Sequence, residues 1–262
     1  TLCAGVHGKD KGTRSIVPLL VSSIYTYMKT SRFVLLLLLA EVSAQGAIVR
    51  TVDVGAALQK GDATKGRISA LVVFAHFNDE ADLAGRAIPS FALDLFDEHV
   101  LGSVTHFYRE MSRGQFHIDG SVLPTWYSAR SSASSYIQPA GSFTDMAREI
   151  IQDVDVDIDL GRYDNDGPDG LPNSGDDDGY VDFLFIVVRS TPPGFIIGQA
   201  TGIARLGLDS DYQSNDVSLS GGNIRIRADG SSRGTGGSVQ QGRNFYEAVG
   251  SMAHEFGHYL GL

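Results

Sequence analysis

The sequence predicts a mixed α/β or α+β domain in which a mostly parallel sheet packs against helices. Three observations support this fold class. Hydrophobic residues make up 42% and charged residues 20%, which is typical of a chain with a packed core. Short apolar runs alternate with segments of helical spacing, in the order β-α-β-α-β-β-α. No repeat of solenoid length is present. The composition also excludes a disordered tail, a collagen-like repeat and a coiled coil.

Four segments have the composition of strands. Residues 68–75 form a β-branched apolar run, which predicts a buried strand. Residues 116–122 alternate between apolar and polar side chains. The continuous apolar character of 180–189 predicts the centre of the sheet. Residues 224–227 alternate between glycine-rich flanks and predict an exposed edge strand that can pair with an extended peptide.

Two segments have the apolar spacing of amphipathic helices. Residues 91–112 place apolar side chains on one helical face, and Gly114 provides a stop signal just after them. The second helix covers 245–260, at the end of the sequence.

A further helix is expected at 142–152, followed by a strand. Ser142 is placed to cap the helix, and Asp145 lies three residues on, as in a capping box. Within 153–160 aspartates alternate with apolar residues, which predicts a strand with one wet, acidic face.

The first methionine, Met28, begins a segment with the layout of a secretory signal peptide. Basic residues come first, an apolar run covers 33–40, and small residues end at Ala44. This pattern predicts a signal peptide over 28–44 and a secreted, extracellular protein. The alternative is a membrane anchor that also uses residues 16–27, but basic residues interrupt the combined stretch. The apolar run at 33–40 is also too short, because about 20 apolar residues are needed to span a bilayer. We therefore expect no stable anchor after cleavage.

The rest of the domain organisation follows from this start. Residues 1–27 are expected to be untranslated upstream sequence, and 45–66 a linker or the remnant of a pro-segment. The single cysteine, Cys3, lies in the excluded part, so the exported chain is expected to have no disulfide. The formal net charge of −10 disfavours nucleic acid as a partner and suits cation binding.

The last predicted helix contains the motif H-E-x-x-H, formed by His254, Glu255 and His258. Residues four apart lie on one helical face, so the two imidazoles can converge on one metal ion. The glutamate is then placed to deprotonate a water that a zinc ion activates, which is typical of peptide-bond hydrolysis. With seven histidines, the motif is expected by chance about 0.005 times in a chain of this composition.

With Gly261 the motif becomes H-E-x-x-H-x-x-G, which resembles the metzincin zinc peptidases. The resemblance implies that this glycine ends the helix sharply and that a third zinc ligand follows at position 264. Because the sequence given ends at Leu262, we expect a truncated fragment with incomplete zinc coordination and no activity of its own.

A narrower resemblance links four segments that occur in one order, over about residues 67–262. Together they are similar to the immune inhibitor A family of secreted bacterial metallopeptidases; the segments are 71–74, 107–116, 181–183 with the Asp-rich stretch before it, and 253–262. The resemblance implies the N-terminal part of a zincin-type catalytic domain and a secreted zinc endopeptidase acting on proteins or peptides. It also implies His254 and His258 as zinc ligands, Glu255 as catalytic base, and an aspartate as third ligand.

An Asp-rich loop precedes the central predicted strand. Glycines allow sharp turns there, and calcium accepts six to eight oxygens in flexible geometry. We therefore expect a calcium site formed by Asp164, Asp166 and Asp178. The loop is not an EF-hand, since Asp169 stands at position six and Gly175 at position twelve. The alternative is a solvated, turn-rich loop.

The remaining candidate ligands and the alternative functions are less specific. Four single histidines are expected to be surface or core residues rather than metal ligands; they are His76, His99, His106 and His117. One alternative function is a non-enzymatic, secreted, calcium-stabilised acidic domain. The other is a zinc hydrolase that acts on something other than peptides.

Overall fold

The computed structural model describes residues 66–198, 200–231 and 234–262. The expected upstream segment 1–27, the signal peptide 28–44 and nearly all of 45–66 lie outside the described residues, so these boundaries stay predictions.

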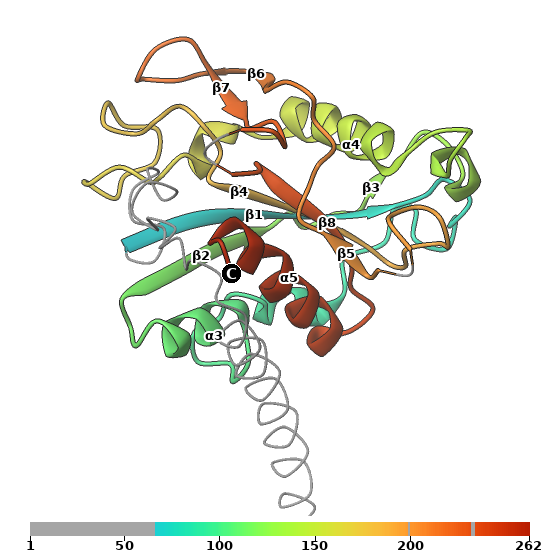
Figure 1. Cartoon of the computed structure of the whole chain (residues 1–262), viewed down its shortest axis with the longest axis horizontal. Coiled ribbons are helices and arrows are strands. Elements are labelled where there is room, and N and C mark those ends of the chain that lie inside the picture. Colours follow the sequence, from blue (N-terminus) through green and yellow to red (C-terminus); the bar gives the residue numbers. More distant parts are fainter. Residues whose placement is uncertain (1–65, 199, 232–233) are drawn as a thin grey trace, which may run out of the picture. The chain divides into compact units, whose positions relative to one another are not determined.

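A mixed, mostly parallel sheet forms the centre of the described part (Figure 1). Its order is β2-β1-β4-β8-β5, where the first four strands run parallel and β5 is antiparallel to β8. The short β3 pairs with the end of β1. The strands are β1 (Gly66–His76), β2 (Phe116–Val122), β3 (Tyr127–Ser128), β4 (Phe183–Val188), β5 (Gly202–Ile203) and β8 (Gly237–Gln241). The predicted fold class is confirmed.

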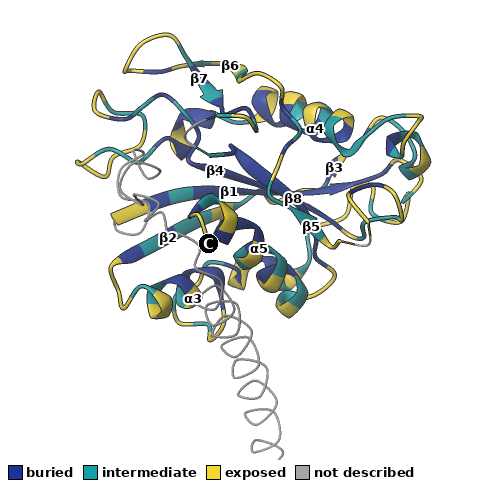
Figure 2. Ribbon diagram, viewed as in Figure 1, coloured by how far each residue is buried: buried dark blue, intermediate teal, exposed yellow. Residues whose placement is uncertain are grey.

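The two central strands, β1 and β4, are buried on both faces. Along β1, Leu71 and Val73 point into one hydrophobic core, whereas Val72 and Phe74 point into the other. All six residues of β4 are buried (Figure 2). This double burial explains why both strands are continuous apolar runs in the sequence, and it confirms the prediction that 180–189 supplies the sheet centre.

Helices cover both faces of this sheet (Figure 1). The core under α4 (Phe143–Asp157) lies on one face, and α3 (Val104–Met111) and α5 (Phe245–Tyr259) share the core on the other. Short 3-10 turns are η2 (Ser90–Asp94), η3 (Ala133–Tyr136) and η4 (Leu160–Tyr163). Among the helices of the described residues, none has the length and apolar character needed to cross a membrane.

The predicted strand at 153–160 is wrong, because α4 covers its first five residues and the 3-10 turn η4 begins at Leu160. Helix α4 continues to Asp157, with Met146, Ile150 and Val154 on its buried side. These residues are spaced by four, and this helical period outweighs the short alternation that suggested a strand. The capping box of Ser142 is present, as predicted.

The helix predicted at 91–112 is interrupted. The structure has only η2 at its start and α3 at its end, because Gly102 adopts a left-handed φ of 85° between them. Ser103 then caps α3 by accepting a hydrogen bond from the backbone N–H of His106 at 3.0 Å. The chain turns away at Gly114, with φ of 77°, as the sequence predicts.

The exposed edge strand predicted at 224–227 is also corrected. Strand β7 (Asn223–Ile226) pairs with β6 (Tyr212–Val217) in a separate two-stranded sheet. Its residues Ile224 and Ile226 are fully buried against the core under α4. The alternating pattern therefore reflects one buried face, and the edge of the main sheet is supplied by β5 instead.

Aromatic side chains hold α5 to the sheet. Phe256 contacts Phe183 of β4 and Tyr108 of α3, with ring centroids 5.0 and 5.1 Å apart. Phe116 of β2 stacks on the same ring at 6.0 Å. A fully buried aromatic residue of this kind contributes both apolar burial and specific ring geometry.

We predict that Phe256→Ala lowers the free energy of unfolding by about 3–5 kcal/mol, because it leaves a cavity at the centre of this cluster. Leu101→Ala is the control, since Leu101 is 79% exposed and its removal is expected to cost under about 0.5 kcal/mol. Urea unfolding followed by circular dichroism measures both values. Equal losses for the two variants would show that the cluster does not anchor α5.

Candidate metal centre

Both ends of α5 are fixed by local hydrogen bonds. The side chain of Asn244 caps the first turn. At the other end, Gly261 adopts a left-handed φ of 79°. Its N–H donates a hydrogen bond to the carbonyl of His258 at 3.1 Å, and the N–H of Leu262 donates one to the carbonyl of Gly257 at 2.9 Å. This pair of bonds is a Schellman motif, and it gives the sharp helix end that the sequence motif predicts.

The motif residues come together on the last turns of α5. One ligand atom from each of His254, Glu255 and His258 lies within 4.8 Å of the others. The two imidazole rings are 4.9 Å apart and nearly perpendicular. Both histidines are exposed, whereas Glu255 is only 5% exposed. Two accessible imidazoles one turn apart, with a carboxylate between them, form a donor set that suits zinc.

These side chains open into a pocket of about 550 Å³. Helix α5 forms one wall with the three motif residues and Tyr259. The opposite wall comes from β5 and its flanking residues, and a third from Asp229 and Thr235. The predicted substrate edge at 224–227 is not among the residues that line the pocket. The antiparallel edge strand beside the motif is β5, which the sequence analysis missed because two residues give no detectable pattern.

The environment of Glu255 makes its carboxylate more basic. Burial raises the pKa of Glu255 above its ordinary value, and the neighbouring charges of His254 and His258 oppose this rise. A carboxylate with a raised pKa accepts a proton more readily near neutral pH, as a general base requires.

A hydrogen bond from α3 fixes the position of α5. The hydroxyl of Tyr108 donates to the backbone carbonyl of Ala253 at 2.6 Å, one residue before the motif. Burial raises the pKa of Tyr108, so its hydroxyl remains protonated and keeps this donor role. No sequence pattern indicates this contact, because α3 and α5 are far apart along the chain.

The structure also brings together the three aspartates singled out in the acidic loop. One carboxylate oxygen each of Asp164, Asp166 and Asp178 lies within 4.8 Å of the others. Asp164 is fully buried, and its Oδ2 accepts a hydrogen bond from the N–H of Gly179 at 3.0 Å. Its Oδ1 is buried without a hydrogen-bond partner among the described residues. Such an atom carries a desolvation cost unless a proton or a cation compensates it.

Other acidic residues of this loop serve the backbone. Asp177 accepts hydrogen bonds from the N–H groups of Gly167 and Ser174, at 2.7 and 2.6 Å. Asp182 accepts from the N–H of Ser69 at 2.7 Å, which ties the loop to β1. Asp177 and Asp182 therefore stabilise the backbone of the loop and its attachment to the sheet.

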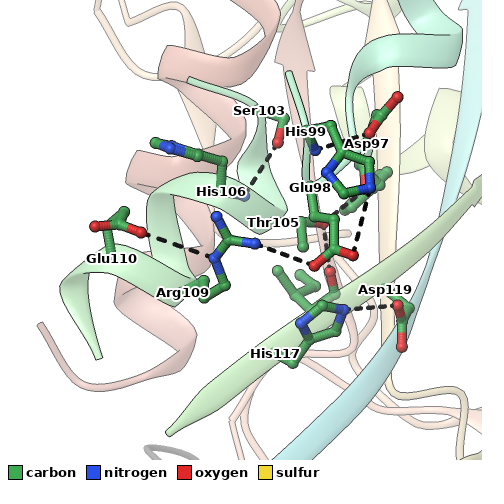
Figure 3. A network of polar contacts seen from close by, with 12 residues as sticks. Asp97, Glu98, His99, Ser103, Thr105, His106, Arg109, Glu110, His117 and Asp119 are labelled. Carbon is green, nitrogen blue, oxygen red and sulfur yellow. Dashed lines mark hydrogen bonds and ion pairs between the residues drawn. The ribbon is translucent and has the colours of Figure 1, made fainter. Parts of the chain in front are cut away.

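The four single histidines lie outside both metal-type groups of the described residues. Figure 3 shows three of them near α3 and β2. His117 contacts Asp119 at 2.9 Å, and His99 lies 3.8 Å from Glu98. His76 is buried, and its Nδ1 lies 2.8 Å from a backbone carbonyl oxygen.

A model of the immune inhibitor A peptidase M6 catalytic domain matches residues 88–262, about two thirds of the chain. The chain belongs to this family. As an M6 peptidase domain it is a hydrolase of the metallopeptidase type, which acts on protein or peptide substrates. The mixed sheet with its three helices is consistent with a zincin-like peptidase fold. No curated protein matches the chain.

The acidic group of this M6 domain gives a pH-dependent prediction. Burial and the neighbouring carboxylates raise the pKa of Asp164 to about 7. In the unfolded chain this pKa is about 3.9. Between these values the folded state binds more protons, so its stability falls as pH rises. We therefore expect that titration of Asp164 lowers the melting temperature, measured in the presence of a chelator, as the pH rises from about 4 to 7.

Asp164→Asn tests this expectation, because the amide does not titrate and the variant should lose that part of the decrease. Asp209→Asn is the control, since Asp209 is exposed and should leave the pH profile unchanged. Identical profiles for wild type and Asp164→Asn would contradict the raised pKa. Differential scanning calorimetry across the pH range provides the measurement.

Proposed function

We propose that this M6 domain is the catalytic core of a secreted zinc endopeptidase. The observation that carries the proposal is the convergence of two imidazoles and a buried carboxylate on one turn of α5, facing a pocket beside an antiparallel edge strand. Family membership supports peptide hydrolysis over the alternative of a non-enzymatic acidic domain.

His254 and His258 are the proposed zinc ligands. A zinc ion held there would supply Lewis acidity and make water a stronger acid. Catalytic zinc sites use three protein ligands. By the metzincin resemblance the third would be an aspartate or histidine at position 264, just after the helix end at Gly261. Assays therefore use the complete gene product.

Glu255 is the proposed general base. Its carboxylate accepts the proton of the attacking water and then passes it to the leaving amine of the cleaved peptide. Its burial beneath the pocket wall supports this role, because a partly desolvated carboxylate holds the transferred proton more readily.

An extended peptide is the proposed substrate, lying along β5. The strand is the last of the main sheet, and its residues line the same pocket as the motif. An edge strand offers backbone groups to any extended chain, so this mode of binding depends little on side-chain identity.

We predict that Glu255→Gln keeps zinc and fold but lowers the cleavage rate of casein by about 10²-fold or more, because the amide cannot accept the proton. Zinc content by mass spectrometry and the melting temperature should match the wild type. Glu110→Gln is the control, because Glu110 is exposed on α3 and lies outside the pocket.

Retained turnover in Glu255→Gln would exclude Glu255 as the base. A wild-type protein that holds zinc but cuts neither casein nor gelatin would instead support a zinc hydrolase with non-peptide substrates. A wild-type protein without stoichiometric zinc would contradict the metal centre itself.

Secretion is proposed from the signal-peptide pattern of 28–44 and from the family, whose members are secreted peptidases. Cleavage after Ala44 would place the mature start at Gln45. Sequencing the N-terminus of the protein recovered from culture medium tests this step.

We also propose that the group of Asp164, Asp166 and Asp178 binds calcium. The partnerless, fully buried Oδ1 of Asp164 supports this proposal, since a cation would compensate its desolvation and the repulsion within the group. Calcium would then stabilise the loop that leads into β4.

We predict that Asp164→Asn has opposite effects in the two conditions. In chelator at pH 8 the variant should melt higher than the wild type, because it removes a repelled, buried charge. With calcium in excess it should melt lower, because the site has lost a ligand charge. A wild type that melts at the same temperature with and without calcium would overturn the calcium site.

A further inference from the structure

We propose that Gly202 is a positioning residue for the carboxylate of Glu255. The absence of a side chain at this position leaves the space in which that carboxylate lies, between α5 and the edge strand β5. The inference rests on the proposed general-base role of Glu255, and it extends the working site from the motif on α5 to a second element of the fold.

The geometry around Gly202 carries the proposal. A Cβ atom built on Gly202 would lie 3.0 Å from both Cγ and Cδ of Glu255, and closer still to Oε1. Atoms that are not bonded to each other do not pack this closely, since carbon contacts are most favourable at about 3.5–4.0 Å. Any side chain at 202 therefore forces either the strand or the carboxylate to move.

Gly202 is not needed for an unusual backbone conformation. Left-handed φ angles occur at thirteen other described glycines, whereas Gly202 has an ordinary φ within its strand. The need for glycine at position 202 is therefore explained by the close approach of the Glu255 side chain and not by the backbone conformation. The closest contacts are all with one residue, since the three atoms nearest to the added Cβ belong to Glu255.

The strand has less freedom to move than the carboxylate. Gly202 and Ile203 pair with Gln240 and Val239 of β8, and the N–H of Gln241 donates to the carbonyl of Thr201 at 2.8 Å. The end of the Glu255 side chain, by contrast, rotates about single bonds. A methyl group at 202 is thus expected to displace the carboxylate relative to His254 and His258.

This displacement has a specific kinetic consequence. Both imidazoles are exposed, line the pocket and are not among the atoms nearest to the added Cβ, so zinc binding should persist. The backbone of β5 keeps its pairing, so substrate binding should change little. Proton transfer, however, requires the base within hydrogen-bond distance, and the loss should fall on kcat.

The test compares Gly202→Ala with Gly250→Ala in the complete gene product. We expect Gly202→Ala to keep stoichiometric zinc and a KM within about twofold of wild type, but to lose at least about tenfold in kcat. Gly250 lies on α5, the helix that carries Glu255, and a Cβ added to it has nothing within 4 Å. Gly250→Ala should therefore keep the wild-type kcat and KM. An unchanged kcat in Gly202→Ala would overturn the proposal.

A double-mutant cycle tests the contact independently of activity. Gly202→Ala should lower the melting temperature in the wild-type background, but by less than half as much when Glu255→Ala is also present, since the clashing side chain is gone. Equal losses in both backgrounds would overturn the proposal even if kcat falls. If the wild type cuts no peptide, the proposed function fails, while this cycle still decides whether Gly202 and Glu255 are coupled.

Discussion

The packing of Phe256 against the sheet is the constraint on which the site depends. An α-helix advances about 100° per residue, so a residue two positions from both motif histidines points away from them by about 200°. Once Phe256 is buried against Phe183, the imidazoles of His254 and His258 must face outward, where the pocket lies. The hydrophobic core thus sets the direction of the metal-binding face without touching it.

The edge strand β5 and helix α5 together line the pocket that contains the motif residues. The central parallel strands β1 and β4 are buried on both faces, and such a core leaves no room for a polar site. Strand β5, which runs antiparallel to β8, forms a pocket wall beside α5, and its residue Gly202 lies against the carboxylate of Glu255. Burial raises the pKa of that carboxylate, and Gly202 is one of the residues packed closely against it.

These contacts explain which features the sequence could predict. The motif residues follow from helical geometry alone, and the strands β1 and β4 follow from apolar runs that burial on both faces requires. The alternation of 153–157 was misleading, because helix α4 buries apolar residues spaced by four, and within this stretch it exposes Val156 and buries Asp155. Strand β5 and the hydrogen bond from Tyr108 to Ala253 had no local signal, since both exist only through contacts between distant segments.

The acidic loop bears on the same packing through β4. Asp178 pairs with the buried Arg227, so one carboxylate of the group is already compensated by the chain, while Oδ1 of Asp164 is not. The loop ends at Asp182, whose bond to the N–H of Ser69 fixes it to β1 immediately before β4 begins. Phe183, the next residue, is one of the aromatic residues on which Phe256 packs. The end of the acidic loop and a packing contact of the metal-binding helix are therefore adjacent in the sequence, at Asp182 and Phe183.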